Sequence, residues 1–162
     1  MNLSLYLDTN VLISLYEGEG ETHDALWQLV NASVGRDDIS FHTSSLSFSE
    51  LLAKPYRERN HRLARQYLTL AMSDGWLVAH DVGARVIELA AVIRAALRMK
   101  LPDALHFATA IIGGCSHMLT SDAGFLGHGD LAHPISGGSI PVSVVAIRPD
   151  AASIASLAKA LS

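Results

Sequence analysis

Short apolar segments alternate with longer segments of helical periodicity along almost the whole chain. Strand-like runs lie at residues 3–7, 39–43, 76–78, 118–120 and 141–147, and helix-like segments separate each from the next. Strands that are separated by helices pair in parallel, because each helix carries the chain back across the sheet before the next strand begins. The sequence therefore predicts an α/β/α sandwich with a central, mostly parallel sheet. We expect residues 1–162 to form it as a single domain.

Turn and cap residues divide the helical part of the chain. The expected helices cover residues 11–16, 21–34, 45–53, 57–72, 83–99, 103–112 and 152–161, with a short helical turn at 122–126. Pro55 is expected to end or kink the third of these helices, since proline disfavours helical geometry in the residue before it. Pro102 suits the first turn of the helix over 103–112. Residues 127–139 contain four glycines and Pro134, and predict a loop to which the sequence assigns no role.

The overall composition excludes several classes of protein. Hydrophobic residues make up 49% of the chain and charged residues 17%, which excludes a disordered chain. The single cysteine, Cys115, excludes an internal disulfide framework and a cysteine-based zinc site, and is typical of a reducing compartment such as the cytoplasm. A net charge of −4 excludes a basic field over the whole molecule.

Residues 104–121 contain no Asp, Glu, Lys or Arg, and so reach the length of a membrane-spanning helix, about 18 residues. They also contain His106, Gly113 and Gly114. We therefore expect this stretch to form a helix, a turn and a strand of a buried core, and we expect no membrane association.

Four carboxylates fall where the predicted sheet would bring them together. Asp8 directly follows the first strand, and Asp122 closely follows the strand at 118–120. Glu50 lies early on the helix after the second strand, and Asp103 lies in the first turn of another helix. In an open α/β sheet, ligands collect at the carboxyl ends of the strands. Four adjacent carboxylates repel one another unless cations neutralise them, and Mg²⁺ or Mn²⁺ suits such oxygen ligands.

Each of these carboxylates also has a purely structural interpretation. Asp8 could cap the helix that follows it, and Glu50 could form a capping box with Ser47. Asp103 is favourable near a helix N-terminus through the helix dipole alone. Asp122 could be only a cap residue. Taken one at a time, most of the four are explained without any function.

Four short motifs together resemble the PIN-domain ribonucleases. They are YLDTNVLI at residues 6–13, SELL at 49–52, LPDALHFATA at 101–110 and LTSDAGF at 119–125. They occur in the order of that family, and with the first strand they span residues 3–125. The chain is most similar to the small prokaryotic members, the VapC toxins of VapBC toxin–antitoxin pairs.

The resemblance implies an α/β/α fold and a Mg²⁺- or Mn²⁺-dependent endoribonuclease that acts as a toxin. By the same resemblance, the catalytic residues are Asp8, Glu50, Asp103 and Asp122. The metal would be held chiefly by Asp8 and Asp103, together with Asp122. Polar side chains at Asn10 and Thr120 would orient these ligands. The implied partners are an RNA substrate, a small VapB-type antitoxin and a second copy in a homodimer.

A basic cluster follows the second carboxylate. It comprises Lys54, Arg57, Arg59, Arg62 and Arg65. Beside an acidic centre these side chains could contact the RNA backbone, whereas the plainer interpretation is a solvated helix face. His106 lies three residues after Asp103 and could approach the site, but a packed, hydrogen-bonded histidine is the favoured interpretation.

Three other functions remain open. One is a housekeeping PIN-domain nuclease that processes RNA. Another is a non-catalytic RNA-binding or scaffold domain, which the four intact acidic positions argue against. The HAD phosphatases also place an aspartate after the first strand, but they need a second one where this chain has Asn10.

Overall fold

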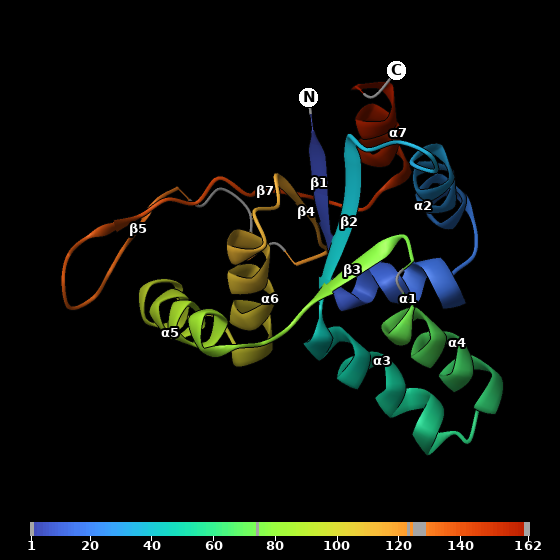
Figure 1. The fold of residues 1–162 in the computed structure, drawn as a ribbon, viewed down its shortest axis with the longest axis horizontal. Coiled ribbons are helices and arrows are strands. Elements are labelled where there is room, and N and C mark those ends of the chain that lie inside the picture. Colours follow the sequence, from blue (N-terminus) through green and yellow to red (C-terminus); the bar gives the residue numbers. More distant parts are fainter. Residues whose placement is uncertain (1, 74, 123, 125–128, 161–162) are drawn as a thin grey trace.

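The computed structural model describes residues 2–73, 75–122, 124 and 129–160. Its centre is a five-stranded sheet with the strand order β3-β2-β1-β4-β7, in which every neighbouring pair is parallel (Figure 1). The strands are β1 (Leu3–Leu7), β2 (Ile39–Ser44), β3 (Leu77–His80), β4 (His117–Leu119) and β7 (Val145–Ile147). The predicted parallel sheet is confirmed.

Helices cover both faces of this sheet. They are α1 (Thr9–Glu17), α2 (Glu21–Ala32), α3 (Ser45–Arg57), α4 (His61–Met72), α5 (Ala84–Leu97), α6 (Leu101–Ile112) and α7 (Ala151–Ala160). On one face, Leu5 of β1 belongs to a core shared with α1, α2, α4 and α7. On the other, Tyr6 and Met118 pack with α5 and α6 (Figure 1). The arrangement is the predicted α/β/α sandwich, and β1 is apolar on both faces because it lies at the centre of the sheet.

The uncharged stretch at 104–121 folds as the sequence predicts. It supplies most of α6, a turn at Gly113 and Gly114, and then β4. Cys115 is buried in this turn. No helix in the described part of the chain is both long and apolar enough to cross a bilayer.

The helical region after β2 differs from the prediction in two ways. Pro55 lies inside the last turn of α3 and does not end the helix, whereas a kink at Pro55 stays a prediction. The helix predicted over 57–72 is split by a sharp reversal, with Arg59 in the left-handed conformation at φ 54°. Asn60 then caps α4. As a result α3 and α4 form a hairpin that extends beyond the carboxyl ends of β1 and β2 (Figure 1).

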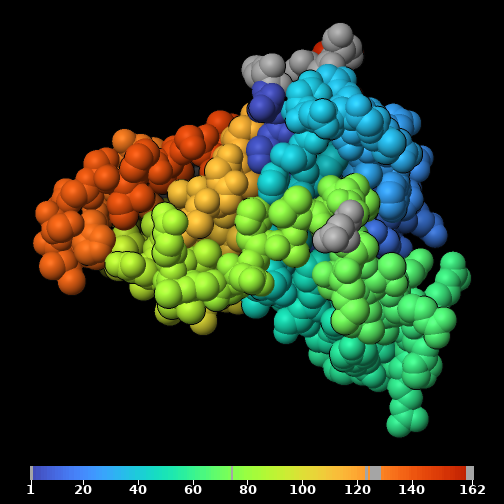
Figure 2. Space-filling view, viewed as in Figure 1, coloured from blue at the N-terminus to red at the C-terminus, as the bar shows by residue number. Residues whose placement is uncertain are grey.

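The glycine-rich segment is not only a loop. It contains a short antiparallel hairpin, β5 (Leu131–Ala132) and β6 (Ser139–Ile140), which lies beside α5 at one end of the molecule (Figure 2). Its turn is closed by hydrogen bonds such as that from the His133 N–H to the Gly138 carbonyl, at 2.8 Å. Residues 127–128, and 123 and 125–126 of the predicted helical turn, lie outside the described residues. The strand predicted over 141–147 is shorter than expected and is formed by β7 alone.

Two histidines form a pair on neighbouring strands. Nδ1 of His42 lies 2.9 Å from Nε2 of His80, and the two rings are stacked with their centroids 5.1 Å apart. The contact needs one protonated and one bare nitrogen, so it is lost when both rings are charged. Burial, and then the charge of His80, lowers the pKa of His42 to about 4. Burial also lowers the pKa of His80.

This pair predicts that the fold loses stability in mild acid. In the unfolded chain a histidine has a pKa of about 6.5. Between that pH and pH ~4 the unfolded chain therefore binds more protons than the folded one. The free energy of unfolding, measured with urea, should therefore fall as the pH is lowered through this window. In His42→Gln the fall should be clearly shallower above pH ~5.5, where ordinary carboxylates are still almost fully ionised. Equal slopes in the two proteins would contradict the prediction.

Candidate active site

The first predicted carboxylate lies at the carboxyl edge of the sheet. Asp8 directly follows β1 and is 7% exposed. Its Oδ1 accepts a hydrogen bond from the Val11 N–H at 3.1 Å, so Asp8 caps α1 as its structural interpretation requires. The same side chain also lines a cavity at this edge. Capping and a place in a site are therefore compatible.

All four predicted carboxylates line that cavity, whose volume is about 280 Å³. They come from four separate segments: the end of β1, the first half of α3, the first turn of α6 and the chain after β4. The lining residues are Asp8, Thr9, Asn10, Ile13, Glu50, Asp103, His106 and Asp122. Positions up to 114 residues apart in sequence thus converge at one end of the parallel sheet.

The surroundings of two of these carboxylates disfavour their charge. Burial raises the pKa of Asp8, and hydrogen bonds from Thr120 and the Val11 N–H offset only part of this effect. Burial, and then the negative charge of Asp122, raises the pKa of Asp103. The two raised pKa values indicate that the surrounding protein groups do not fully compensate the negative charges of Asp8 and Asp103. A cavity with uncompensated negative charge favours the binding of a cation.

Glu50 does not cap the N-terminus of its own helix, α3. Ser44 caps α3 by accepting a hydrogen bond from the Leu46 N–H at 3.2 Å. Ser47 instead shares a 2.8 Å hydrogen bond with Thr43. The capping-box interpretation of Glu50 is therefore wrong, and its carboxylate is free to face the cavity.

The Glu50 carboxylate is held by two side chains from other elements. His106 Nε2 lies 2.9 Å from Oε2 of Glu50, and the Thr9 hydroxyl donates to the same oxygen. Burial raises the pKa of Glu50, but these two hydrogen bonds outweigh burial and leave the pKa below its ordinary value. Glu50 is therefore the carboxylate that the protein itself keeps ionised.

His106 is both packed and part of the cavity wall. The sequence correctly predicts a buried, hydrogen-bonded histidine, since His106 is 5% exposed and Tyr6 also contacts it. The spacing of three between Asp103 and His106 on one helix indicates from sequence that His106 could approach the site. Sequence reasoning did not predict its contact with Glu50, and it missed Thr9 as a partner of Glu50.

The two predicted orienting residues differ in their surroundings. Thr120 is buried, hydrogen bonds to the Asp8 carboxylate, and accepts the Asp122 N–H at 3.1 Å. Asn10 is exposed and lines the cavity. Asp122 is exposed too, and its Oδ1 accepts the Gly124 N–H at 2.8 Å. Thr120 thus connects the first and last carboxylates.

The donor chemistry of the cavity suits a hard cation. Carboxylate, amide and hydroxyl oxygens predominate among its polar groups, and oxygen ligands are those that Mg²⁺ prefers. In the described residues, His, Cys, Asp and Glu side chains form no group of three or more that is close enough to hold an ion directly. Mg²⁺ keeps several of its waters and needs only one or two direct carboxylate ligands, so the oxygen groups of the cavity fit it on their chemistry.

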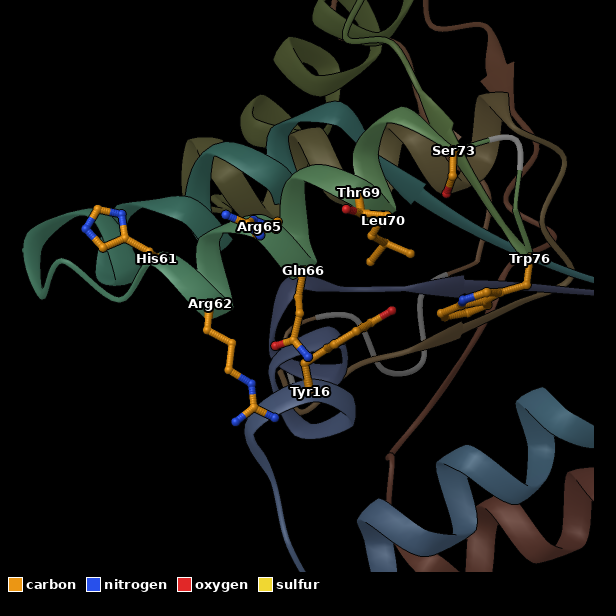
Figure 3. Close-up of a pocket in the computed structure, with 9 residues that line it drawn as sticks. All are labelled: Tyr16, His61, Arg62, Arg65, Gln66, Thr69, Leu70, Ser73 and Trp76. Carbon is orange, nitrogen blue, oxygen red and sulfur yellow. The ribbon is translucent and has the colours of Figure 1, made fainter.

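The basic cluster lies on the α3–α4 hairpin, and none of its members lines the carboxylate cavity. Lys54 pairs with Glu17 at 2.8 Å. Arg62 and Arg65 line a separate, larger cavity of about 740 Å³ between α4, Tyr16 and Trp76 (Figure 3). The other members of the cluster, Arg57 and Arg59, are exposed near the turn of the hairpin.

A family model gives the class of protein. The model of the PIN domain matches residues 5–130. The chain belongs to the PIN domain family. No curated protein matches the chain significantly in sequence.

Solved structures of toxin–antitoxin proteins share this fold. A chain of VapBC2 from Rickettsia felis, solved bound to a DNA fragment from its promoter, is 14% identical, with a TM-score of 0.62 over 90% of this chain and 98% of that one. A chain of a Klebsiella pneumoniae toxin–antitoxin complex is 19% identical, with a TM-score of 0.58 over the same shares. VapC20 of Mycobacterium tuberculosis, a toxin that cleaves the sarcin–ricin loop, is 20% identical, with a TM-score of 0.56 over 74% of this chain and 90% of that one. At these identities the likeness concerns the fold.

Proposed function

We propose that this PIN-domain protein is a Mg²⁺- or Mn²⁺-dependent endoribonuclease and the toxin of a type II toxin–antitoxin pair, acting as one domain. The observation that carries the proposal is the convergence of Asp8, Glu50, Asp103 and Asp122 on one cavity. The raised pKa values of Asp8 and Asp103 support it, because carboxylates that resist ionisation alone are stabilised by a divalent ion.

The residues divide into distinct proposed roles. Asp8, Asp103 and Asp122 hold the cation, and Thr120 and Asn10 orient these ligands. When bound, the ion lowers the pKa of its water and neutralises the charge that develops on the phosphate. Glu50, kept ionised by its hydrogen bonds, orients the attacking water and accepts its proton.

The structural relatives support the role of a toxin. Two of the three come from toxin–antitoxin complexes, and the third is a toxin that cleaves an RNA loop. We accordingly propose RNA as the substrate, a small VapB-type antitoxin as the partner, a homodimer as the assembly and the cytoplasm as the location.

The decisive experiment is end-mapping of RNA incubated with the purified protein, with and without a chelator. Cleavage that leaves 5′-phosphate and 3′-hydroxyl ends, and that stops with the chelator, supports the nuclease. Expression of the chain should also arrest growth, whereas expression of Asp8→Asn should not. Cleavage that continues in the presence of the chelator would contradict the proposed metal dependence. An active nuclease whose expression does not slow growth would contradict the proposed role as a toxin.

The basic cluster is proposed to contact the RNA backbone. Removing two phosphate contacts in Arg62→Gln/Arg65→Gln should weaken RNA binding and reduce the slope of log K against log salt by about 1.4 for single-stranded RNA. The matched control is Arg85→Gln/Arg94→Gln, which removes the same charge from α5 on the opposite side of the fold (Figure 1). Slopes that fall equally in the two double variants would indicate only a general charge effect.

A further inference from the structure

A chain of hydrogen bonds runs from the buried sheet to the cavity. The Tyr6 hydroxyl lies 2.7 Å from Nδ1 of His106, and Nε2 of His106 lies 2.9 Å from Oε2 of Glu50. Tyr6 is fully buried in β1 and His106 is 5% exposed. The three side chains come from β1, α6 and α3, so the chain ties three elements together at the carboxyl edge of the sheet.

The direction of each hydrogen bond follows from the chemistry of its partners. The Tyr6 hydroxyl keeps its proton at neutral pH, because a phenol ordinarily loses its proton only at pH ~10. Glu50, as a carboxylate, can only accept. His106 must therefore carry a proton on Nε2 to donate to Glu50. In a neutral imidazole this leaves Nδ1 bare, and Nδ1 accepts the hydroxyl proton of Tyr6.

Both donors to Glu50 meet the same oxygen. His106 and the Thr9 hydroxyl each contact Oε2, and Thr9 also lies 3.4 Å from Nε2 of His106. Among the described residues, Oε1 of Glu50 accepts no side-chain hydrogen bond that competes with this arrangement. A carboxylate fixed through one oxygen has little freedom to rotate, so its other oxygen keeps a constant direction in the cavity.

We propose that Tyr6 and His106 are positioning residues that fix Glu50 through Oε2 and leave Oε1 to act on the water or hydrated cation. This rests on the proposed nuclease function. Both residues act through Glu50, since Tyr6 is fully buried and both ring nitrogens of His106 are engaged by Tyr6 and Glu50. A histidine with only a packing role would affect the stability of the α6–sheet contact but not the turnover of correctly folded enzyme.

Kinetics of three variants test the proposal. His106→Leu removes the donor to Glu50 and should lower kcat about 10- to 100-fold, with KM changed less than about twofold. His106→Gln restores an N–H at the position of Nε2 and should recover part of the loss. Tyr6→Phe keeps the ring but frees His106, and should lower kcat less than His106→Leu does. Unchanged kcat in folded His106→Leu and Tyr6→Phe would overturn the proposal.

Tyr67→Phe is the matched control. Tyr67 is also fully buried, and its hydroxyl donates to a carboxylate, Oε1 of Glu17, at 2.6 Å, away from the carboxylate cavity. This variant should lose stability as Tyr6→Phe does, yet keep the kcat of the parent protein. A loss of kcat in Tyr67→Phe equal to that in Tyr6→Phe would count against a specific role for Tyr6.

The tautomer of His106 provides a readout that does not depend on activity. Long-range ¹H–¹⁵N spectra at mildly alkaline pH should show the proton on Nε2 in the parent protein. In Tyr6→Phe the preference for Nε2 should be weaker, because Glu50 alone then favours it. If the parent protein cleaves no RNA, the nuclease proposal fails, and the spectra still decide whether Tyr6 orients His106 toward Glu50. A proton on Nδ1 in the parent protein would overturn the positioning role.

Discussion

Asp8→Asn is expected to lower RNA cleavage about a thousandfold or more while leaving the protein folded. The substitution removes one negative ligand of the cation that we propose. The stabilisation of transition-state charge by such an ion amounts to several kcal/mol, and about 4 kcal/mol corresponds to a thousandfold in rate. Initial rates of RNA cleavage in saturating Mg²⁺ or Mn²⁺ measure the effect.

The same substitution should not destabilise the protein, and this separates a functional carboxylate from a structural one. Asn keeps an oxygen for the Val11 N–H, so the cap of α1 is retained. Because the pKa of Asp8 is raised, ionised Asp8 favours the unfolded chain at neutral pH, where unfolding relieves the cost of its burial. Without added metal, Asp8→Asn should therefore be at least as stable as the parent protein. Asp8→Ala, which loses the cap, should be less stable than Asp8→Asn by about 1 kcal/mol.

Asp150→Asn is the matched control for both measurements. Asp150 caps the start of α7, where its Oδ1 accepts the Ser153 N–H at 2.8 Å, and it lies outside the carboxylate cavity. Hydrogen bonds from Ser153 lower its pKa, so its ionised form favours folding, in contrast to that of Asp8. Asp150→Asn should cleave RNA at the parent rate and should gain no stability. An Asp8→Asn protein that cleaves RNA like the Asp150→Asn control would rule out the proposed role of Asp8.

The parts of the fold that local sequence determines were predictable. Alternating apolar residues define β1, Pro102 and the glycines at 113 and 114 bound α6, and helices separate the strands β1, β2, β3 and β4 from one another. The reversal between α3 and α4 could not be predicted from the sequence, because it depends on Arg59 adopting a left-handed conformation that residues with a side chain rarely adopt. The β5–β6 hairpin was also missed, since two-residue strands carry almost no periodic signal.

The candidate site shows the same division. Asp8 and Asp103 were predictable because a strand end and a helix start fix where their side chains lie. The anchoring of Glu50 was not, because its partner His106 is 56 residues away and sits within an apolar helical run. From sequence, such a histidine has the pattern of a core residue. Only the packing of α6 against the sheet brings it within reach of Tyr6 and the Glu50 carboxylate.

Binding of Mg²⁺ or Mn²⁺ is expected to stabilise the parent protein strongly. The ion would offset the repulsion between Asp103 and Asp122 and the burial of the Asp8 charge. At a free concentration of a hundred times Kd, a ligand of the folded state adds about 2.7 kcal/mol to the free energy of unfolding. For a domain of this length that corresponds to a rise in Tm of about 5–10 °C. Thermal unfolding with increasing metal, reversed by a chelator, measures it.

The pH dependence of this stabilisation distinguishes the cavity from ordinary surface carboxylates. Protons compete with the ion for Asp8 and Asp103, and since both pKa values are raised, this competition begins at a higher pH than for exposed aspartates. The metal-induced rise in Tm should therefore shrink as the pH is lowered from neutral, while surface carboxylates are still ionised. Asp150→Asn should keep the full rise, and Asp8→Asn should lose most of it. An equal rise in both variants would place the bound ion outside the carboxylate cavity and remove the electrostatic basis of the proposed nuclease.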